Sequence, residues 1–168
     1  MKATLVVEGK EFPIEINDPE LQKLIAPPKK TGYERVEENA GMYYQYPDGY
    51  ISASFDHHNA TADKYYDAAN YYSDKHVAEN NARADRLMRQ MRRFAAEHRK
   101  RELRWKIRGQ NKYQVYYNYS LDQLGIGHDE LCKNFGSIYF DTEETANLAI
   151  EAFHDDLIWY FTAYKDSL

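Results

Sequence analysis

The hydrophobic and polar positions of this 168-residue chain change their period several times. Over residues 3–16 they alternate on either side of Gly9, which predicts a β-hairpin with the glycine in its turn. Residues 17–25 begin with capping side chains and a proline, and predict a short helix. A Pro- and Lys-rich stretch without any period follows. We therefore predict a small module over residues 1–26 and a linker over residues 27–40.

Residues 41–168 are predicted to form one α+β domain. Two Tyr-rich strands are expected over residues 43–55, around a Pro-Asp-Gly turn, and two more over residues 112–127. Each pair of strands is followed by a short aromatic strand, a capping residue and a helix. At an offset of 68 residues the copies match Tyr71 with Tyr139, Tyr72 with Phe140, Asp74 with Thr142, and Ala78 with Ala146. This pattern predicts a degenerate duplication of ββ-then-βα units over about 41–104 and 110–161. The alternative is that the two copies arose independently.

Between the two units the pattern predicts one long amphipathic helix. No Gly or Pro occurs between Asp74 and Arg108, so nothing in the sequence interrupts it. At 100° per residue its apolar side chains share one arc of about 120°, the width of a stripe that faces a core. This arc holds Val77, Ala84, Leu87, Met88, Met91, Phe94, Ala95, His98 and Trp105. The opposite face holds Arg86, Arg89, Arg93, Lys100 and Arg104, with Arg92 and Arg99 along one edge.

The predicted helix is also where the positive charge of the chain is concentrated, so any function must account for it. Residues 83–108 hold eleven Lys or Arg against three acids, whereas the rest of the chain holds 11 basic and 24 acidic residues. Nine of the eleven are arginine, whose planar group binds phosphate or carboxylate in a bidentate way. Five phosphate contacts would make log affinity fall with log salt at a slope of roughly −4 to −5. We therefore predict that the basic face, meaning Arg86, Arg89, Arg93, Lys100 and Arg104, binds nucleic acid or an acidic protein surface.

A purely structural role for the same charges stays open. Four i,i+4 pairs with the acid first would stabilise the helix: Glu79–Arg83, Asp85–Arg89, Glu97–Arg101 and Glu102–Lys106. The remaining basic groups would then meet the protein's own acidic residues or an acidic patch of a second subunit. The chain as a whole is acidic, unlike most tight sequence-specific DNA binders, and it has no helix-turn-helix, zinc-finger or ribonucleoprotein motif.

No pattern in the sequence indicates a catalytic site, a metal site or a cofactor. His57 and His58 lack the spacing of zinc ligands, although they and nearby acids leave a metal-dependent nuclease as a third hypothesis. The Gly-x-Gly at residues 125–127 has no third glycine and is typical of a turn. Cys132, the single cysteine, is expected to be a lone buried thiol in a reducing compartment. No signal peptide or membrane-spanning run is recognisable, so we expect a cytoplasmic protein.

A family likeness is carried by four stretches, KTGYERVEENAGMYYQYPDG, NYYSDKHVAEN, NKYQVYYNYS and GSIYFDTEETANLAIEAF. Over about residues 30–165 the chain resembles small uncharacterised proteins of prophages and conjugative elements of Firmicutes. Small phage proteins of this kind include anti-CRISPR inhibitors, which bind a Cas effector or its guide RNA. The resemblance implies a non-enzymatic phage protein that inhibits bacterial immunity by binding a nucleoprotein effector. The alternative is an acidic adaptor protein whose basic helix mediates homodimer or other protein contacts.

Overall fold

The computed structural model describes most of the chain, namely residues 2–7, 9–19 and 30–167. The chain divides into two compact units, Met1–Lys30 and Thr31–Leu168. The basic residues 83–108 lie entirely in the second unit, so the search for a functional site concerns that unit.

The first unit contains the β-hairpin that the alternating pattern predicted. Strand β1 (Lys2–Val7) pairs antiparallel with β2 (Lys10–Glu15). Gly9 lies between them with a φ of 77°, a conformation that glycine adopts without steric cost. The short helix predicted over residues 17–25 falls mainly outside the described residues.

The second unit contains two β-hairpins and three described helices, so the predicted α+β class is confirmed. Its elements are β3 (Gly41–Gln45), β4 (Ile51–Phe55), α2 (Ala60–Asp67), α3 (Lys75–Glu97), β5 (Lys112–Asn118), β6 (Gln123–Asp129) and α4 (Glu143–Thr162). Strand β3 pairs antiparallel with β4, and β5 pairs antiparallel with β6. Within the described part of the chain the hairpins form two separate sheets rather than one shared sheet.

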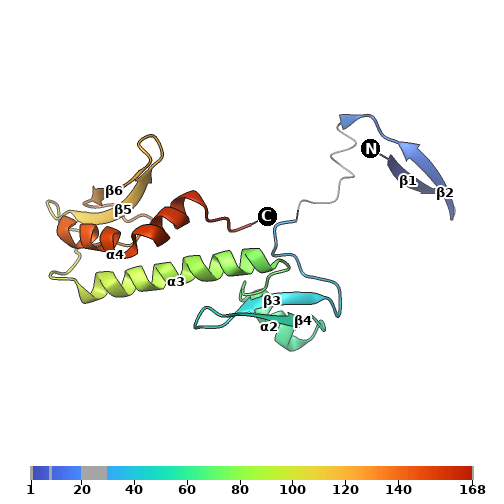
Figure 1. Ribbon diagram of the computed structural model, residues 1–168, viewed down its shortest axis with the longest axis horizontal. Helices are drawn as coiled ribbons and strands as arrows, with labels where there is room; N and C mark the ends of the chain where they lie inside the picture. Colours follow the sequence, from blue (N-terminus) through green and yellow to red (C-terminus); the bar gives the residue numbers. More distant parts are fainter. Residues whose placement is uncertain (1, 8, 20–29, 168) are drawn as a thin grey trace. The chain divides into compact units, whose positions relative to one another are not determined.

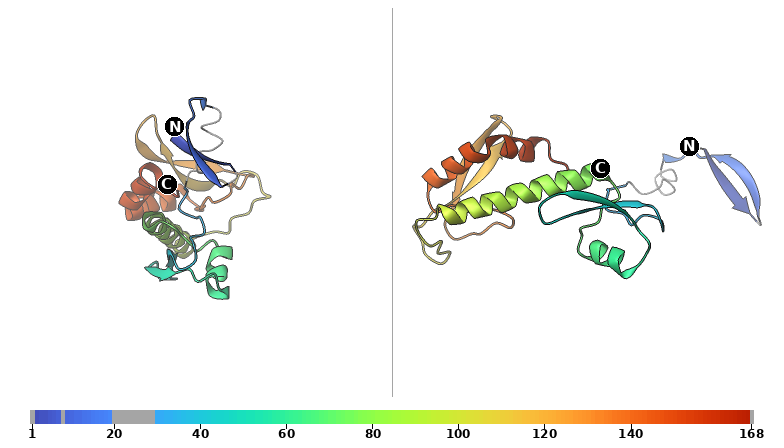
Figure 2. Two further views of the ribbon diagram at one scale, coloured as in Figure 1. Left: turned by 90° about the vertical axis from the view of Figure 1, so that its right-hand side faces the viewer. Right: turned by 60° about the horizontal axis from the view of Figure 1, so that its bottom comes forward.

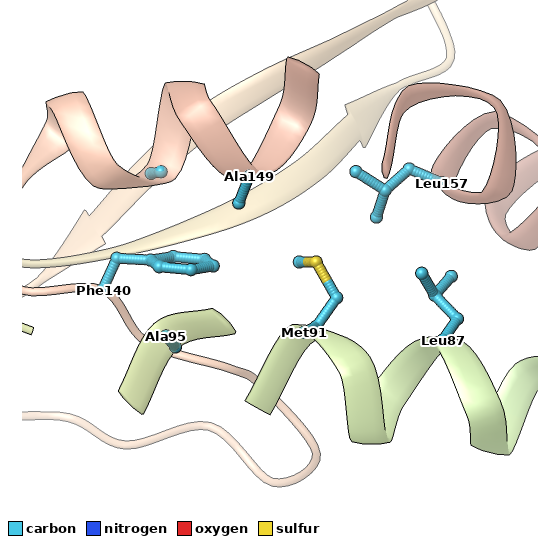
Figure 3. Close-up of a cluster of buried hydrophobic side chains, with 7 residues drawn as sticks. Leu87, Met91, Ala95, Phe140, Ala149 and Leu157 are labelled. Atoms are coloured by element: carbon cyan, nitrogen blue, oxygen red, sulfur yellow. The ribbon is translucent and has the colours of Figure 1, made fainter. Parts of the chain in front are cut away.

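Helix α3 lies between the two hairpins and contributes to two cores (Figures 1 and 2). Near its N-terminus Val77 and Ala78 are buried together with Tyr72, on the side of the first hairpin. Further along, Leu87 and Met91 are buried against α4 and the segment that precedes it (Figure 3). The second core also contains Ala95, Phe140, Ala146, Ala149 and Leu157. Apolar burial therefore attaches both hairpin regions to the same helix.

The first strand of each hairpin forms the same kind of backbone contact with the segment that precedes a long helix. For β3 this segment precedes α3, and for β5 it precedes α4. Tyr43 and Tyr72 exchange two backbone hydrogen bonds of 2.8 and 2.9 Å, and Tyr113 and Phe140 exchange two of the same lengths. Each contact is a single bridge rather than the short strand that we predicted. Two residues after each bridge a capping side chain starts the next helix, as the sequence pattern indicated.

A second pair of contacts also occurs at matched positions. The Tyr71 hydroxyl donates to a carboxylate oxygen of Asp56, and the Tyr139 hydroxyl donates to one of Asp129, both at 3.0 Å. Each hydroxyl also accepts a hydrogen bond from a backbone N–H, at 3.1 Å for Tyr71 and 3.0 Å for Tyr139. A duplication would produce such agreement, and the duplication itself stays a prediction.

The residues just before β3 belong to the second unit, whereas we predicted a linker over residues 27–40. The Gly32 carbonyl accepts a hydrogen bond from the Ser73 N–H at 2.8 Å. The Val36 N–H donates to the Tyr71 hydroxyl at 3.1 Å. The predicted linker is therefore too long at its C-terminal end, because the polar composition of this stretch does not reveal its long-range hydrogen bonds.

Helix α3 is shorter than the uninterrupted helix predicted between Asp74 and Arg108, because it ends at Glu97. A carboxylate oxygen of Asp141 accepts the backbone N–H groups of Lys100, at 2.7 Å, and Arg101, at 3.0 Å. In a continuing helix these N–H groups would bond to carbonyls four residues earlier. A side chain distant in sequence therefore replaces the next helical turn, and the sequence shows no Gly or Pro that would mark this end.

Asp56 is a fully buried carboxylate that ties the segment before β3 to the first hairpin. It accepts hydrogen bonds from the Arg35 guanidinium (2.9 Å), the Tyr71 hydroxyl (3.0 Å) and the His58 backbone N–H (2.7 Å). The hydrogen bond from Arg35 is the main reason that the pKa of Asp56 is lowered to about 2. Asp56 is therefore ionised in the folded protein at neutral pH.

We predict that Asp56→Asn makes the free energy of unfolding less sensitive to acid. The folded-state pKa of about 2 lies below the ordinary value of 3.8. Ionised Asp56 therefore stabilises the fold above about pH 4, and this contribution is lost as the pH falls through about 2. Urea unfolding across this range should show a larger loss of stability for the wild type than for the variant. The exposed Asp67→Asn variant should keep the wild-type slope, and equal slopes for all three proteins would contradict this assignment.

Candidate functional site

Helix α3 carries five of the eleven basic side chains of residues 83–108, which we call the basic segment, and the other six follow the helix. Asp74 caps its N-terminus by accepting the Val77 N–H at 3.0 Å. From there to Glu97 neither Gly nor Pro interrupts the backbone. Because the two cores take up the apolar side chains, arginines occupy much of the surface that remains.

The five basic residues predicted as one binding face do not lie on one helix face. Arg86, Arg89 and Arg93 are on α3 and are exposed. Lys100 and Arg104 lie in the loop that follows the helix, because α3 ends early. The structure therefore keeps three of the five together on the helix and places the other two elsewhere.

The ion pairs of the basic segment differ from the four i,i+4 pairs that we predicted. The partnered side chains are Arg83 with Asp156 (2.7 Å), Arg93 with Glu97 (3.8 Å), Lys100 with Glu144 (3.0 Å), Arg104 with Glu102 (2.8 Å), and Arg101 with the backbone carbonyl of Asp141. Arg83 also lies 4.0 Å from the centre of the Trp159 ring. None of the four predicted pairs forms among the described residues, since acids on α4 and in the loops lie closer to several of these basic groups.

Six basic side chains of the segment have no hydrogen-bond or ion-pair partner in the part of the chain that the structure describes. They are Arg86, Arg89, Arg92, Arg99, Lys106 and Arg108. All six are exposed. An exposed ion pair contributes only about 0–1 kcal/mol, so the missing partners cost the fold little. The protein's own acidic residues therefore account for only part of the basic segment, and these six groups are available to a ligand.

Arg89 lines a hollow of about 450 Å³ beside the first hairpin, which we name the tyrosine hollow. Its wall includes Tyr44 and Tyr65, whose rings stack with centres 4.3 Å apart, and Tyr46, whose ring meets that of Tyr44 edge-on at 5.3 Å. Burial is the main reason that the pKa of Tyr65 is raised, so this phenol is protonated at neutral pH. Asp85 is the acidic side chain in the lining. The hollow thus presents flat rings beside one arginine and one carboxylate.

A second hollow, of about 220 Å³, lies toward the C-terminal end of α3, and we name it the arginine hollow. It is lined by the exposed side chains of Arg92, Arg99 and Lys133, none of which has a partner among the described residues. Trp105 and Tyr139 also line it, with their rings edge-to-face at 4.7 Å. None of its described lining residues is acidic, so the charges here are all positive.

Both hollows lie on the same flank of α3. Asp85, Arg89 and Arg92 are spaced by four and then three residues, so they project from one side of the helix. Arg89 and Arg92 are separated by about 4.5 Å along the helix axis. We name Arg89, Arg92, Arg99 and Lys133 together the basic flank.

Arg86 lies apart from the basic flank. It lines a third hollow, of about 470 Å³, with Tyr50 and Arg83. The ion pair between Lys75 and Glu79, at 3.1 Å, lies in the same lining. Of the five residues predicted from the sequence, Arg89 is therefore the one that belongs to the basic flank.

The loop that carries Arg99 is held in place by Asp141. This buried side chain accepts the N–H groups of Lys100 and Arg101, and the Arg101 guanidinium donates back to the Asp141 carbonyl. The other carboxylate oxygen, Oδ1, has no partner among the described atoms. Asp141 therefore sets where the chain turns away from α3 and where Arg99 enters the arginine hollow.

Sequence reasoning put Arg92 and Arg99 at the edge of the basic face but did not select them, and it missed Lys133. The helical periodicity contained the signal for the two arginines, because they flank the predicted face. Which side of α3 stays open depends on the position of the first hairpin. Lys133 comes from the loop between β6 and α4, and no spacing in the sequence connects it to α3.

The histidines singled out in the sequence contact nearby polar groups. His57 Nδ1 lies 2.7 Å from the Asn39 side-chain oxygen, and His58 Nε2 lies 3.1 Å from the Val36 carbonyl oxygen. Among the described residues no three His, Cys, Asp or Glu side chains come together as metal ligands would. Cys132 is exposed, whereas we expected it to be buried. None of the described helices has the length and apolar character needed to cross a bilayer.

Comparison with protein-family models, curated proteins and solved structures gave no match to this chain. Its function must therefore be argued from the geometry and charge of the basic flank.

We predict that Asp141→Ala releases the loop after α3 and lowers the free energy of unfolding by about 1–3 kcal/mol, since two backbone N–H groups lose their buried acceptor and each such hydrogen bond contributes about 0.5–1.5 kcal/mol. Hydrogen exchange of the Lys100 and Arg101 amides should become faster, and urea unfolding should give the stability change. Asp155→Ala is the matched control, because that side chain is fully exposed and contacts only the neighbouring His154. If both variants exchanged like the wild type, Asp141 would not be the anchor of this loop.

Proposed function

We propose that this chain is a non-enzymatic binding protein that holds nucleic acid on the basic flank of α3, as part of a nucleoprotein complex in the cytoplasm of a bacterial cell. One observation carries the proposal. Arg89, Arg92, Arg99 and Lys133 line two hollows on one side of the same helix, and none of them has an acidic partner among the described residues.

The chemistry of the flank favours phosphate as the group it holds. Three of its four members are arginines, which bind phosphate with two parallel hydrogen bonds. The arginine hollow has no acid in its described lining, so an anion there meets only favourable charge. The residues outside the basic segment are strongly acidic and would repel a polyanion elsewhere, which restricts binding to the flank.

The adaptor alternative explains less of what is observed. A structural role fits five of the eleven basic side chains of the segment, since four form ion pairs and Arg101 donates to the Asp141 carbonyl. This alternative does not explain the six exposed basic side chains that have no partner among the described residues. A homodimer that used the basic flank would have to bring an acidic patch to it, and light scattering at low and high salt would detect such a dimer.

We predict that the triple variant Arg89→Glu, Arg92→Glu, Arg99→Glu loses most nucleic-acid binding. Fluorescence anisotropy with a labelled single-stranded DNA should show an affinity lowered by roughly tenfold or more. The slope of log affinity against log salt should become shallower by about 2, because each phosphate contact on a single strand contributes about 0.7. The melting temperature should change by less than about 4 °C, since the exposed arginines contribute little to stability.

The control is the triple variant Lys10→Glu, Lys30→Glu, Lys165→Glu, which changes the net charge by the same amount outside the flank. It should bind almost as the wild type does. If the two triple variants bound equally, net charge rather than the flank would set the affinity. The proposed function would be refuted if the wild type bound none of the three polyanions at low salt, namely single-stranded DNA, duplex DNA and heparin.

The resemblance to prophage proteins supports a narrower form of the proposal, in which the nucleic acid belongs to a Cas effector and the chain acts as an anti-CRISPR inhibitor. The tagged wild-type chain is then expected to capture a Cas effector, together with its guide RNA, from cells that carry one. Capture should weaken in high salt and should be lost with the Arg89, Arg92, Arg99 triple variant. Capture of no Cas protein under any salt condition would refute the narrower form and leave nucleic-acid binding standing.

A further inference from the structure

The tyrosine hollow carries flat aromatic surface that no core uses. The ring of Tyr44 stacks on that of Tyr65 and meets that of Tyr46 edge-on. The rings of Tyr46 and Tyr50 are also stacked, with their centres 6.2 Å apart. Tyr46 and Tyr50 keep 44% and 65% of their surface exposed. These four rings form a connected row from Tyr65 on α2 to the turn of the first hairpin, where Tyr46 and Tyr50 face solvent.

The row is held rigidly by its own hairpin. Tyr44 and Tyr46 are two residues apart along the strand and its extension, so their side chains lie on the same face. Their hydroxyl oxygens are 3.2 Å apart. The Asn70 side chain binds both the N–H and the carbonyl of Gln45, each at 2.8 Å, which fixes the backbone between the two tyrosines. Such preorganised rings lose little freedom when a ligand stacks on them.

We propose that the ligand of the basic flank is a single-stranded nucleic acid, with a base stacked on the exposed Tyr46 of the tyrosine hollow while its phosphates contact the arginines. This inference rests on the proposed function and names the form of nucleic acid that the flank takes. Proteins that bind single strands combine a positive groove with aromatic side chains on which successive bases stack. A duplex keeps the faces of its bases within the helical stack and offers no ring to Tyr46.

The size and lining of the hollow suit a base. Its volume of about 450 Å³ lies within the range of about 300–1,000 Å³ that is typical of ligand pockets. Arg89 lies in the lining with the rings, where it can reach a phosphate or stack on a base. From Arg89 the strand would pass to Arg92, about 4.5 Å further along the helix axis, and then into the arginine hollow.

Asp85 favours a nucleic acid over an acidic protein in this position. It is exposed, lines the tyrosine hollow and has no hydrogen-bond or ion-pair partner among the described residues. Its carboxylate would repel a phosphate as well as the Asp and Glu side chains of an acidic peptide, so the part of a ligand that lies beside it must be uncharged. The amino groups of adenine, cytosine and guanine, in contrast, are donors that a carboxylate accepts.

The test is Tyr46→Leu, with Tyr116→Leu as its matched control. Both tyrosines belong to hairpins and are 44% exposed, but Tyr116 lines neither hollow. Tyr46→Leu should weaken binding of a short oligo-dT by roughly 5- to 150-fold, as the loss of one stacked base predicts. Its heparin affinity and its salt slope should stay at the wild-type values. Tyr46→Phe keeps the ring and should bind as the wild type does, and Tyr116→Leu should also bind normally.

The outcomes separate this inference from the proposed function. If Tyr46→Leu bound oligo-dT normally while the arginine triple variant did not, base stacking would be refuted and phosphate binding would stand. Preference of the wild type for a duplex over a single strand of the same length would also overturn the inference. If the wild type bound an acidic protein but no oligonucleotide, both proposals would fail. Circular dichroism melting of each variant shows whether a loss of binding is a loss of fold.

Discussion

The whole second unit depends on one helix being buried in two different cores along its length. Near its start α3 packs Val77 and Ala78 against the first hairpin region, and further on it packs Leu87 and Met91 against α4. Burying an apolar side chain of this size contributes about 1.5–3 kcal/mol, whereas an exposed ion pair contributes about 0–1 kcal/mol. Apolar contacts therefore fix the position of α3, and the charged side chains occupy the surface that neither core needs. Arg89 and Arg92 of the basic flank lie on that remaining surface.

The same division explains why arginines close together in sequence have different roles. Nine of the ten arginines of the chain lie between residues 83 and 108. Arg83 points to α4, where it binds Asp156 and covers the Trp159 ring, and Arg101 is bonded to the Asp141 backbone. Arg89 and Arg92 point to the open side and form no ion pair among the described residues. Residue type alone does not assign these roles, since the side of the helix on which each arginine lies decides them.

Periodicity and turn residues were enough to predict the hairpins, the N-caps of α3 and α4, and the apolar stripe of α3 as far as Ala95, because each of these depends on neighbours in the sequence. They did not predict α2, which begins at Ala60 in a stretch that is polar in sequence. They did not predict where α3 ends. Asp141 stops it by binding the N–H group of Lys100, which is 41 positions away, and every residue except proline offers such a group. The arginine hollow was missed for a similar reason, because Lys133 reaches it from a separate loop. Local pairs such as Glu79–Arg83 fitted the spacing rule, but Asp156 on α4 binds Arg83 instead. The choice between a local acid and a distant one is made only once the chain has folded.

Helix α3 belongs by sequence to the first ββ-then-βα unit and by packing to both. Phe140 is almost fully buried, and the surface that buries it includes side chains of α3 that precede β5 in the chain. A fragment that begins at β5 would leave Phe140 and its neighbours facing water, and a fragment that stops after α3 would leave Leu87 and Met91 in the same condition. The two copies are alike in pattern and yet are not interchangeable modules. Neither half of the second unit can be removed or moved to another protein without exposing part of the core that the two halves share.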